Sequence, residues 1–175
     1  MIMDGLVCYF AVITTKSDPT DKTIRLERYM KITNQKFQED DYEFYCHICS
    51  AHVLESSKHC GRCKRCCADF DHHCIWLNNC IGKSNYRIFF KLIVLVLVNS
   101  ILSIVTGTEL LEFLKHKYGL IDWNWESSLL LTNIILNSLS FVFIGYLLAY
   151  HLWLIKNKMT TYQHIIMQRN SRVEK

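Results

Sequence analysis

The stretch CHICSAHVLESSKHCGRCKRCCADFDHHCIWLNNC, residues 46–80, decides the fold of this chain. It holds eight of the nine cysteines in the 175 residues, and only Cys8 stands outside it. The stretch shows little apolar periodicity and many small polar residues. A segment of this kind cannot hold itself together by a hydrophobic core, so disulfides or metal ions must do so.

Two long apolar runs follow this stretch. Leu92–Thr108 is an uncharged run of 17 residues, and Ser127–Ile155 is an uncharged run of 29 residues. A helix needs about 20 apolar residues to span a bilayer, so the sequence predicts transmembrane helices over 88–108 and 131–155. Trp123 and Trp125 fit the aromatic belt at a membrane border. The alternative, two buried helices of a soluble core, is disfavoured by the length and uniformity of the runs.

The distribution of basic residues predicts the orientation. Of 20 Lys and Arg, thirteen lie in residues 1–91, two lie between the apolar runs, and five lie after residue 155. The positive-inside rule places both ends of the chain in the cytosol and the segment 109–130 on the other side. Cytosolic thiols stay reduced, so the cysteine stretch is interpreted as metal-binding. The formal net charge of +4 does not call for a nucleic acid partner.

The spacing of Cys and His indicates two structural zinc sites. A structural zinc takes four ligands, mostly Cys and His, so two sites need eight. Adjacent residues such as His59 and Cys60 point apart in an extended chain and therefore serve different ions. The simplest assignment gives one zinc Cys46, Cys49, His59 and Cys66, and the other zinc Cys60, Cys63, His73 and Cys80.

Several Cys and His residues remain outside this assignment. His47 and His52 are interpreted as exposed loop histidines. Cys67 is interpreted as a spare thiol or an alternate ligand. Cys74 is a cysteine that neither zinc needs, and two interpretations stay open for it: a further ligand, with His72 as a surface residue, or a nucleophile.

The residues before Cys74 favour the nucleophile. His72 shares a face with Cys74 in an extended chain, because residues at i and i+2 project to the same side. A nearby His lowers the pKa of a thiol or takes its proton. Asp71 can orient that His and stabilise its charged form, provided that the chain bends between the two residues.

The same residues resemble the cysteine-rich domain of DHHC-type protein S-acyltransferases (palmitoyltransferases). The family pattern is Cys-x2-Cys-x9-His-Cys-x2-Cys-x2-Cys-x4-Asp-His-His-Cys-x5-Cys, and the chain matches every interval from Cys46 to Cys80. Asp18-Pro19 and Thr160-Thr161-Tyr162-Gln163 stand where the family carries Asp-Pro-Gly and Thr-Thr-x-Glu. Ile75 replaces the usual Pro, and Gln163 replaces the usual Glu. The resemblance covers roughly residues 6–165.

This resemblance implies a protein S-acyltransferase. Cys74 takes the acyl group from a long-chain acyl-CoA, palmitoyl-CoA being the expected co-substrate, and passes it to a substrate protein with a membrane-proximal cysteine. His72 is the general base, Asp71 orients it, and Thr161 hydrogen-bonds Asp71. The two zinc ions are structural. Arg62, Lys64 and Arg65 either attract the CoA phosphates or solvate a loop.

The expected fold is an integral membrane α-helical protein with a cytosolic, loop-rich, zinc-stabilised domain that contains short β-hairpins. The family carries four or more membrane helices, so the chain is expected to lack the first helix and most of the second. The expected compartment is the Golgi or endoplasmic reticulum, with the plasma membrane as the alternative. The expected segments are a membrane-helix remnant at 1–15, a cytosolic linker at 16–45 with a short helix near 22–32, the zinc domain at 46–87, transmembrane helices at 88–108 and 131–155, a non-cytosolic loop at 109–130 and a cytosolic tail at 156–175.

Other functions remain in competition. A truncated, inactive member of the same family and a membrane-anchored zinc adaptor for protein interaction both fit the zinc ligands. A RING-type ubiquitin ligase also interleaves two zinc sites, but it does not account for Asp71-His72 before a spare cysteine.

Overall fold

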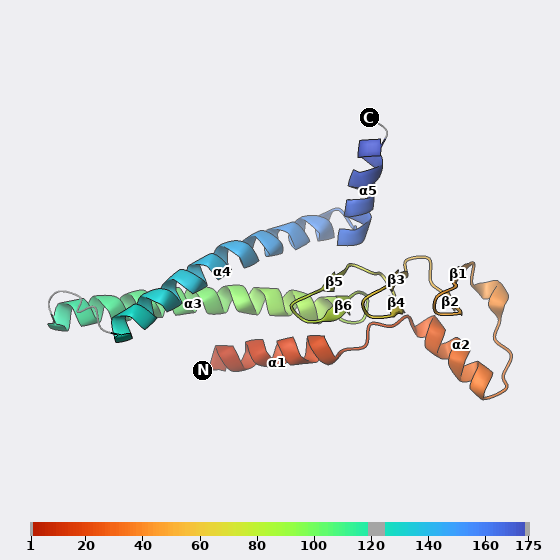
Figure 1. The fold of residues 1–175 in the computed structure, drawn as a ribbon, viewed down its shortest axis with the longest axis horizontal. Coiled ribbons are helices and arrows are strands. Elements are labelled where there is room, and N and C mark those ends of the chain that lie inside the picture. Colours follow the sequence, from red (N-terminus) through yellow and green to blue (C-terminus); the bar gives the residue numbers. More distant parts are fainter. Residues whose placement is uncertain (1, 119–124, 174–175) are drawn as a thin grey trace. The chain divides into compact units, whose positions relative to one another are not determined.

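The computed structural model describes residues 2–118 and 125–173 (Figure 1). The chain divides into two compact units. The cysteine-rich unit comprises residues 10–89 and 154–175, and the helical unit comprises residues 1–9 and 90–153. The elements in chain order are α1 (Ile2–Lys16), α2 (Lys22–Ile32), the 3-10 helix η1 (Glu39–Asp41), β1 (Phe44–Cys46), β2 (Ala51–Val53), β3 (Lys58–Cys60), β4 (Arg65–Cys67), β5 (His72–Cys74), β6 (Asn79–Ile81), α3 (Tyr86–Tyr118), α4 (Trp125–Lys156) and α5 (Thr161–Val173).

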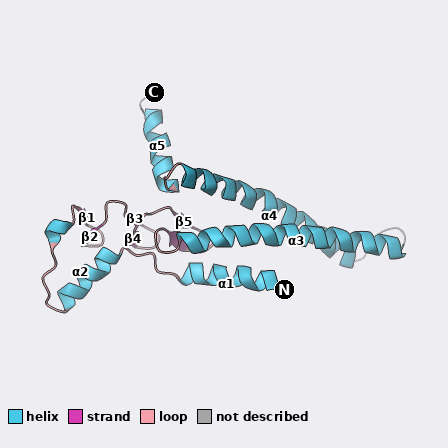
Figure 2. Ribbon diagram, turned by 180° about the vertical axis from the view of Figure 1, so that it is seen from behind, coloured by secondary structure: helices cyan, strands magenta, loops and turns pink. Residues whose placement is uncertain are grey.

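Three short antiparallel hairpins make up the cysteine-rich stretch, as predicted (Figure 2). They pair β1 with β2, β3 with β4, and β5 with β6. Each hairpin contains one non-glycine residue with a positive φ angle at its turn: Ser50, Lys64 and Asn78. Such a residue lets the chain reverse tightly, so a Cys or His before the turn can approach a Cys within the turn or after it.

The buried apolar clusters of this unit are very small. One joins Ile24, Ala51, Val53 and Cys66, and another joins Cys60, Cys67 and Cys80. Clusters of this size bury far too little apolar surface to offset the conformational entropy of ordering the hairpins. The hairpins therefore need a second source of stability.

Helix α2 attaches to the first hairpin through buried carboxylates. Its N-cap Asp21 accepts from the backbone N–H of Thr23 at 2.8 Å and, with its other oxygen, from the N–H of Leu54 at 2.9 Å. Glu27, only 1% exposed, accepts from the backbone N–H of His52 at 2.6 Å and from Lys31 at 2.6 Å. Helix α2 confirms the short helix predicted near 22–32. Its carboxylates accept hydrogen bonds from backbone N–H groups of β2 and of the residue that follows it.

His52 is therefore not the exposed loop histidine that was expected. It lies half-buried on β2, and its Nδ1 donates to Glu27 at 3.2 Å. This contact could not be predicted from the sequence, because the carboxylate comes from a helix 25 residues earlier. His47 is exposed, in agreement with the prediction.

Helices α3 and α4 are each long and apolar enough to cross a membrane. They approach one another closely in the helical unit, since a side chain added at Gly107 would meet Ile134 at 2.8 Å. The hydroxyl of buried Ser100 also donates to that of Ser140 at 3.4 Å. Large apolar side chains on α4 stay exposed, with Leu139 at 63% and Val142 at 68%. A surface of this kind is typical of a helix that faces lipid.

Both long helices exceed their predicted limits. The segment 109–130 was expected to be a loop, but 109–118 continues α3 and 125–130 begins α4. The prediction ended the first helix before Glu109 and limited the second to the length that spans a bilayer, whereas Glu and Lys are good helix formers and a helix that leaves the apolar zone loses no backbone hydrogen bonds. Trp123 lies outside the described residues, and Trp125 is the first residue of α4.

We expect Glu27→Ala to lower the free energy of unfolding of the cysteine-rich unit by about 1–3 kcal/mol, because the buried N–H of His52 loses its acceptor. The measurement is the urea midpoint of zinc release, followed with a zinc-sensitive dye. Glu39→Ala, an exposed acid of η1, is the matched control and is expected to leave the midpoint unchanged. Equal midpoints for the two variants would contradict the role given to Glu27.

Candidate active site and metal centres

The first group of metal ligands joins two hairpins. Cys46 and Cys49 flank the turn of the first hairpin, and His59 and Cys66 face each other across the second. The Nδ1 of His59 lies 3.8, 3.3 and 3.7 Å from the Sγ atoms of Cys46, Cys49 and Cys66. A zinc tetrahedron with bonds of about 2.0–2.3 Å has edges of roughly 3.4–3.8 Å. These distances are those of a tetrahedral ligand set.

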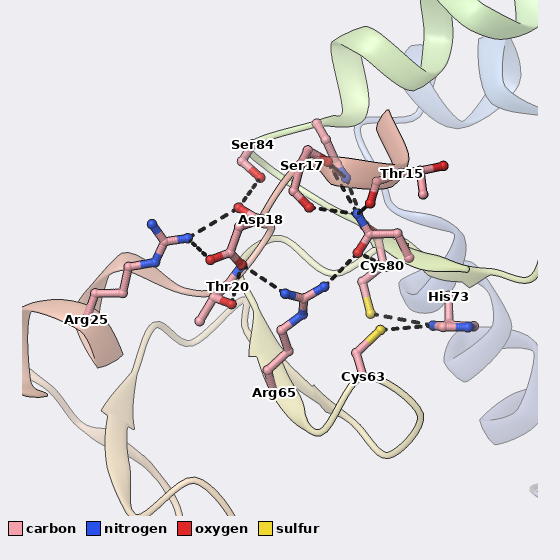
Figure 3. Close-up of polar contacts among 12 residues, drawn as sticks. Thr15, Ser17, Asp18, Thr20, Arg25, Cys63, Arg65, His73, Cys80 and Ser84 are labelled. Atoms are coloured by element: carbon pink, nitrogen blue, oxygen red, sulfur yellow. Dashed lines mark hydrogen bonds and ion pairs between the residues drawn. The ribbon is translucent and has the colours of Figure 1, made fainter. Parts of the chain in front are cut away.

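The second group repeats the arrangement one hairpin further along. Cys60 and Cys63 come from the second hairpin, and His73 and Cys80 face each other across the third. The Nδ1 of His73 lies 3.7 Å from the Sγ of Cys60. It lies 3.3 and 3.8 Å from the Sγ atoms of Cys63 and Cys80, the two contacts drawn in Figure 3. The two groups contain the same eight residues that the spacing assigned to zinc.

The chemistry of both groups fits a dication. Burial, followed by the neighbouring thiols, raises the pKa of Cys66 and of Cys80 well above that of an ordinary thiol. The third thiol of each group therefore resists ionisation on its own. A bound Zn²⁺ would hold all three as thiolates and would offset the cost of burying them.

The two groups link the three hairpins in series. His59 and Cys60 are neighbours in β3, yet one belongs to the first group and the other to the second. The second hairpin therefore contributes ligands to both groups, while the first and third contribute to one each. The loss of one ligand site would free a hairpin that has almost no apolar core of its own.

Asp71, His72 and Cys74 lie together at the third hairpin. The Nδ1 of His72 donates to the Oδ2 of Asp71 at 2.7 Å, so the chain makes the bend that this contact requires. His72 also makes a side-chain hydrogen bond with Cys74, two residues further along β5. His73, between them, contributes to the second ligand group. The alternation of an extended strand therefore separates the metal ligand from the acid–base pair.

Asp71 is held by a helix far away in the sequence. It is 2% exposed. The backbone N–H of Thr161 donates to its Oδ1 at 3.0 Å, and the hydroxyl of Thr161 donates to its Oδ2 at 2.8 Å. Gln163 closes a capping box with Thr160, since its Oε1 accepts from the N–H of Thr160 at 2.8 Å. The uncharged Gln163 therefore fills the N3 position of a capping box, where a Glu is the usual alternative.

The electrostatics of the three residues favour a charged pair. Burial raises the pKa of Asp71, but hydrogen bonds from His72 and Thr161 outweigh it and hold that pKa below its ordinary value. Burial lowers the pKa of His72, but its hydrogen bonds to Asp71 and Cys74 raise it to about 9. For Cys74, burial again opposes charge, yet the hydrogen bond with His72 lowers the thiol pKa. A thiolate beside an imidazolium is a nucleophile ready for acyl transfer.

Cys67 is a spare thiol, the first of the two interpretations considered for it, and Arg65 is engaged in contacts with other side chains. Cys67 is fully buried against Gly82 and, within the described residues, belongs to neither ligand group. Burial raises the pKa of Cys67 to about 12. Arg65 donates to Asp18 at 3.1 Å and to Asn79 at 2.8 Å, so its guanidinium is engaged inside the protein. Neither contact could be foreseen from spacing.

A cleft of about 930 Å³ opens beside Asp71 in the cysteine-rich unit. Four cations line it, Lys58, Lys83, Arg87 and Lys158, together with the carboxylates of Glu55, Asp69 and Asp71, and Lys83 pairs with Asp69 at 3.7 Å. The aromatic rings of Phe70 and Tyr162 also line it, and they meet edge to face with centroids 5.7 Å apart. The sequence analysis missed this cleft, because its cations come from four separate segments and form no run.

Comparison with known proteins agrees with this geometry. A sequence model of the family described as "DHHC palmitoyltransferase" matches residues 39–168. The chain belongs to this family. It is 36% identical over 131 residues to "Probable protein S-acyltransferase 15" of Arabidopsis thaliana, a match that covers 72% of the chain and 49% of that relative. It is 31% identical over 121 residues to "Palmitoyltransferase ZDHHC15A" of Danio rerio, covering 67% of the chain and 35% of the relative.

This DHHC protein therefore spans half or less of the length of the two relatives named. The matched region contains both ligand groups, the Asp71–His72–Cys74 arrangement and Thr161. The family membership predicted from the cysteine spacing is confirmed.

We expect Cys66→Ser to reduce the zinc content from two ions per chain to one, because it removes a ligand from the first group. Cys67→Ser changes the adjacent buried thiol, which lies outside both groups, and is expected to keep two ions. The zinc content of each purified variant is measured by metal analysis. An unchanged zinc content in Cys66→Ser would show that the first group is not a zinc site.

Proposed function

We propose that this DHHC protein is a protein S-acyltransferase that moves a palmitoyl or similar long-chain acyl group from acyl-CoA to protein cysteines, with Cys74 as the nucleophile. The observation that carries the proposal is the hydrogen-bonded series Asp71–His72–Cys74, in which the thiol pKa is lowered. Cys74 is the cysteine of the third hairpin that the ligand groups leave over.

The reaction has two balanced steps. In the first, the thiolate of Cys74 attacks the thioester carbonyl, the bond between that carbon and the CoA sulfur breaks, and the departing CoA thiolate takes the proton of His72. In the second, His72 accepts the proton of a substrate cysteine, whose sulfur attacks the acyl-enzyme and releases Cys74. Asp71 keeps the Nδ1 proton on His72 throughout, and Thr161 fixes Asp71.

The metal groups have a structural role in this proposal. Bound zinc supplies no group to the reaction and holds the three hairpins together. The ligands Cys46, Cys49, His59 and Cys66 fix the first pair of hairpins, and Cys60, Cys63, His73 and Cys80 fix the second pair. His73 and Cys80 flank Cys74 on its hairpin and so set its position.

The cationic cleft is suited to the CoA head group. Lys58, Lys83, Arg87 and Lys158 present positive charge to phosphates, and aromatic rings offer a surface for a base. Asp71 lines the same cleft, so the cleft lies one residue away from His72. This assignment replaces Arg62, Lys64 and Arg65 of the sequence analysis, since Arg65 is engaged with Asp18 and Asn79 and none of the three is among the described residues that line the cleft.

We further propose that α3 and α4 cross a bilayer, with the cysteine-rich unit and both ends of the chain in the cytosol and 109–130 on the other side. The exposed apolar side chains of α4 and the excess of Lys and Arg outside 109–130 support this orientation. A thioester cleaved at the bilayer surface leaves the acyl chain in lipid and CoA in water. Residues 1–15 would continue the apolar layer, and Golgi or endoplasmic reticulum is the expected compartment.

The test is autoacylation. The chain is placed in membranes with alkyne-labelled palmitoyl-CoA, and we expect a hydroxylamine-labile label that Cys74→Ser abolishes. Cys8→Ser, which changes an exposed thiol on α1, is the matched control and should keep the label. A parent protein that holds two zinc ions yet takes no label would favour the alternative, an inactive relative or a zinc adaptor that binds partner proteins.

The cleft has its own test. We expect Lys58→Glu to raise the KM for palmitoyl-CoA about three- to tenfold with little change in kcat, because one phosphate contact becomes repulsive. Lys64→Glu makes the same charge change at the turn of the second hairpin, which is not among the cleft residues, and should leave KM unchanged. Equal KM values for the two variants would remove Lys58 from the binding surface.

A further inference from the structure

One buried amide joins the end of α1 to the hairpin that carries Cys74. Asn79 is 1% exposed. Its Nδ2 donates to the backbone carbonyl oxygens of Thr14, Thr15 and Ser17 at 3.0, 3.1 and 2.8 Å. Each of these carbonyls lies in the last turn of α1 or directly after it.

The carbonyls at the end of a helix have no partner within the helix. Where such an end is buried, a carbonyl left without a donor loses the hydrogen bond that it would make in water. At the end of α1, the Ser17 N–H satisfies Ile13, and Asn79 supplies the donor for the carbonyls that follow. Asn79 therefore acts as a C-terminal cap contributed from a strand more than sixty residues away.

The other end of the same amide holds the hairpin. The Oδ1 of Asn79 accepts from the backbone N–H of Cys80 at 2.9 Å and from Arg65 at 2.8 Å. In the register of the hairpin, Asn79 lies directly opposite Cys74. The Asn79 side chain thus contacts the end of α1 and the backbone of Cys80, from the strand position that lies opposite the nucleophile.

Two further contacts secure the junction. Asn85, which is fully buried, donates to the hydroxyl of Ser17 at 2.8 Å and to the carbonyl of Cys80 at 2.9 Å. Asp18 lies between Arg25 and Arg65 and pairs with both (Figure 3). Arg65 in turn contacts Asn79. The residues after α1 are therefore bound to the hairpin on two sides.

We propose that Asn79 is a positioning residue for acyl transfer, which holds the Cys74 hairpin at a fixed place relative to the end of α1. The inference rests on the proposed acyltransferase function. A hairpin free to shift against the end of α1 would carry the thiolate of Cys74 away from the position where it meets the thioester. A displacement of about 1 Å between reacting groups can cost on the order of a hundredfold in rate.

The test compares two adjacent and chemically identical substitutions. Asn79→Asp keeps the size of the side chain but turns a carboxylate toward three carbonyl oxygens. Asn78→Asp makes the same change at the exposed turn residue. We expect the autoacylation rate to fall about tenfold or more in Asn79→Asp and to stay at the parent value in Asn78→Asp.

Two readouts separate positioning from unfolding. Asn79→Asp is expected to keep two zinc ions and to keep the parent rate of Cys74 alkylation by iodoacetamide, because nucleophile and metal sites remain intact. If Asn79→Asp loses zinc, Ser17→Ala decides, since it changes no hairpin residue and removes the hydroxyl that accepts from Asn85 and Asn79 and donates to the Thr14 carbonyl. Ser17→Ala should then slow acylation, and Thr15→Ala, which keeps its carbonyl, should not.

Hydrogen exchange tests the junction without relying on activity. We expect the amides of residues 10–20 to exchange faster in Asn79→Asp than in Asn78→Asp, because α1 loses its cap. This result would stand even if the parent took no acyl label, so failure of the proposed function and failure of the positioning role are distinguishable. Parent-like acylation or parent-like exchange in Asn79→Asp overturns the proposal.

Discussion

The cysteine-rich unit depends on one constraint: four donor atoms from two successive hairpins must come together as one ligand set. The chain meets this constraint at two places. His59 and Cys60 are neighbours in β3 and belong to different groups, so the second hairpin is shared between both. The buried apolar clusters contain only a few residues each. In other domains a hydrophobic core fixes the positions of the strands. Here ligand atoms 3.3–3.8 Å apart fix them, and these distances fit a zinc tetrahedron.

Buried carboxylates and amides connect this framework to the helices. Asp21 and Glu27 attach α2 to the first hairpin, Asp71 attaches the start of α5 to the third, and Asn79 attaches the end of α1. Each of these polar groups is buried, and each has a hydrogen bond with a backbone group of another segment. A polar group of this kind is costly if unpaired, so it ties two segments together with a specificity that a small apolar contact lacks. Asp71 serves both purposes, because it also orients His72.

The spacing of Cys and His predicted a great deal of this site. The eight ligand residues, the short hairpins, the helix near 22–32 and the pairing of Asp71 with His72 were all expected from the pattern. The limits of α3 and α4 were not, because charge alone does not end a helix. The contact of His52 with Glu27 and that of Arg65 with Asn79 join residues 25 and 14 positions apart. The cationic cleft collects residues from four segments, which no local pattern reveals.

By itself, the sequence determined the chemistry of this DHHC protein: the eight metal-ligand residues, the leftover Cys74, the neighbouring His72 and the apolar length of two helices. These properties depend on residue type and on intervals of a few residues, and geometry over such intervals is nearly independent of the rest of the fold. Only the tertiary structure decided which distant groups complete the site. The contact of Thr161 with Asp71 was implied by the family resemblance, whereas Asn79 reaches Thr14 across 65 positions and Glu27 reaches His52 across 25 with no sequence pattern to indicate either. The physical reason is that a buried donor or acceptor takes its partner from whichever segment packs beside it, and packing is a property of the whole chain.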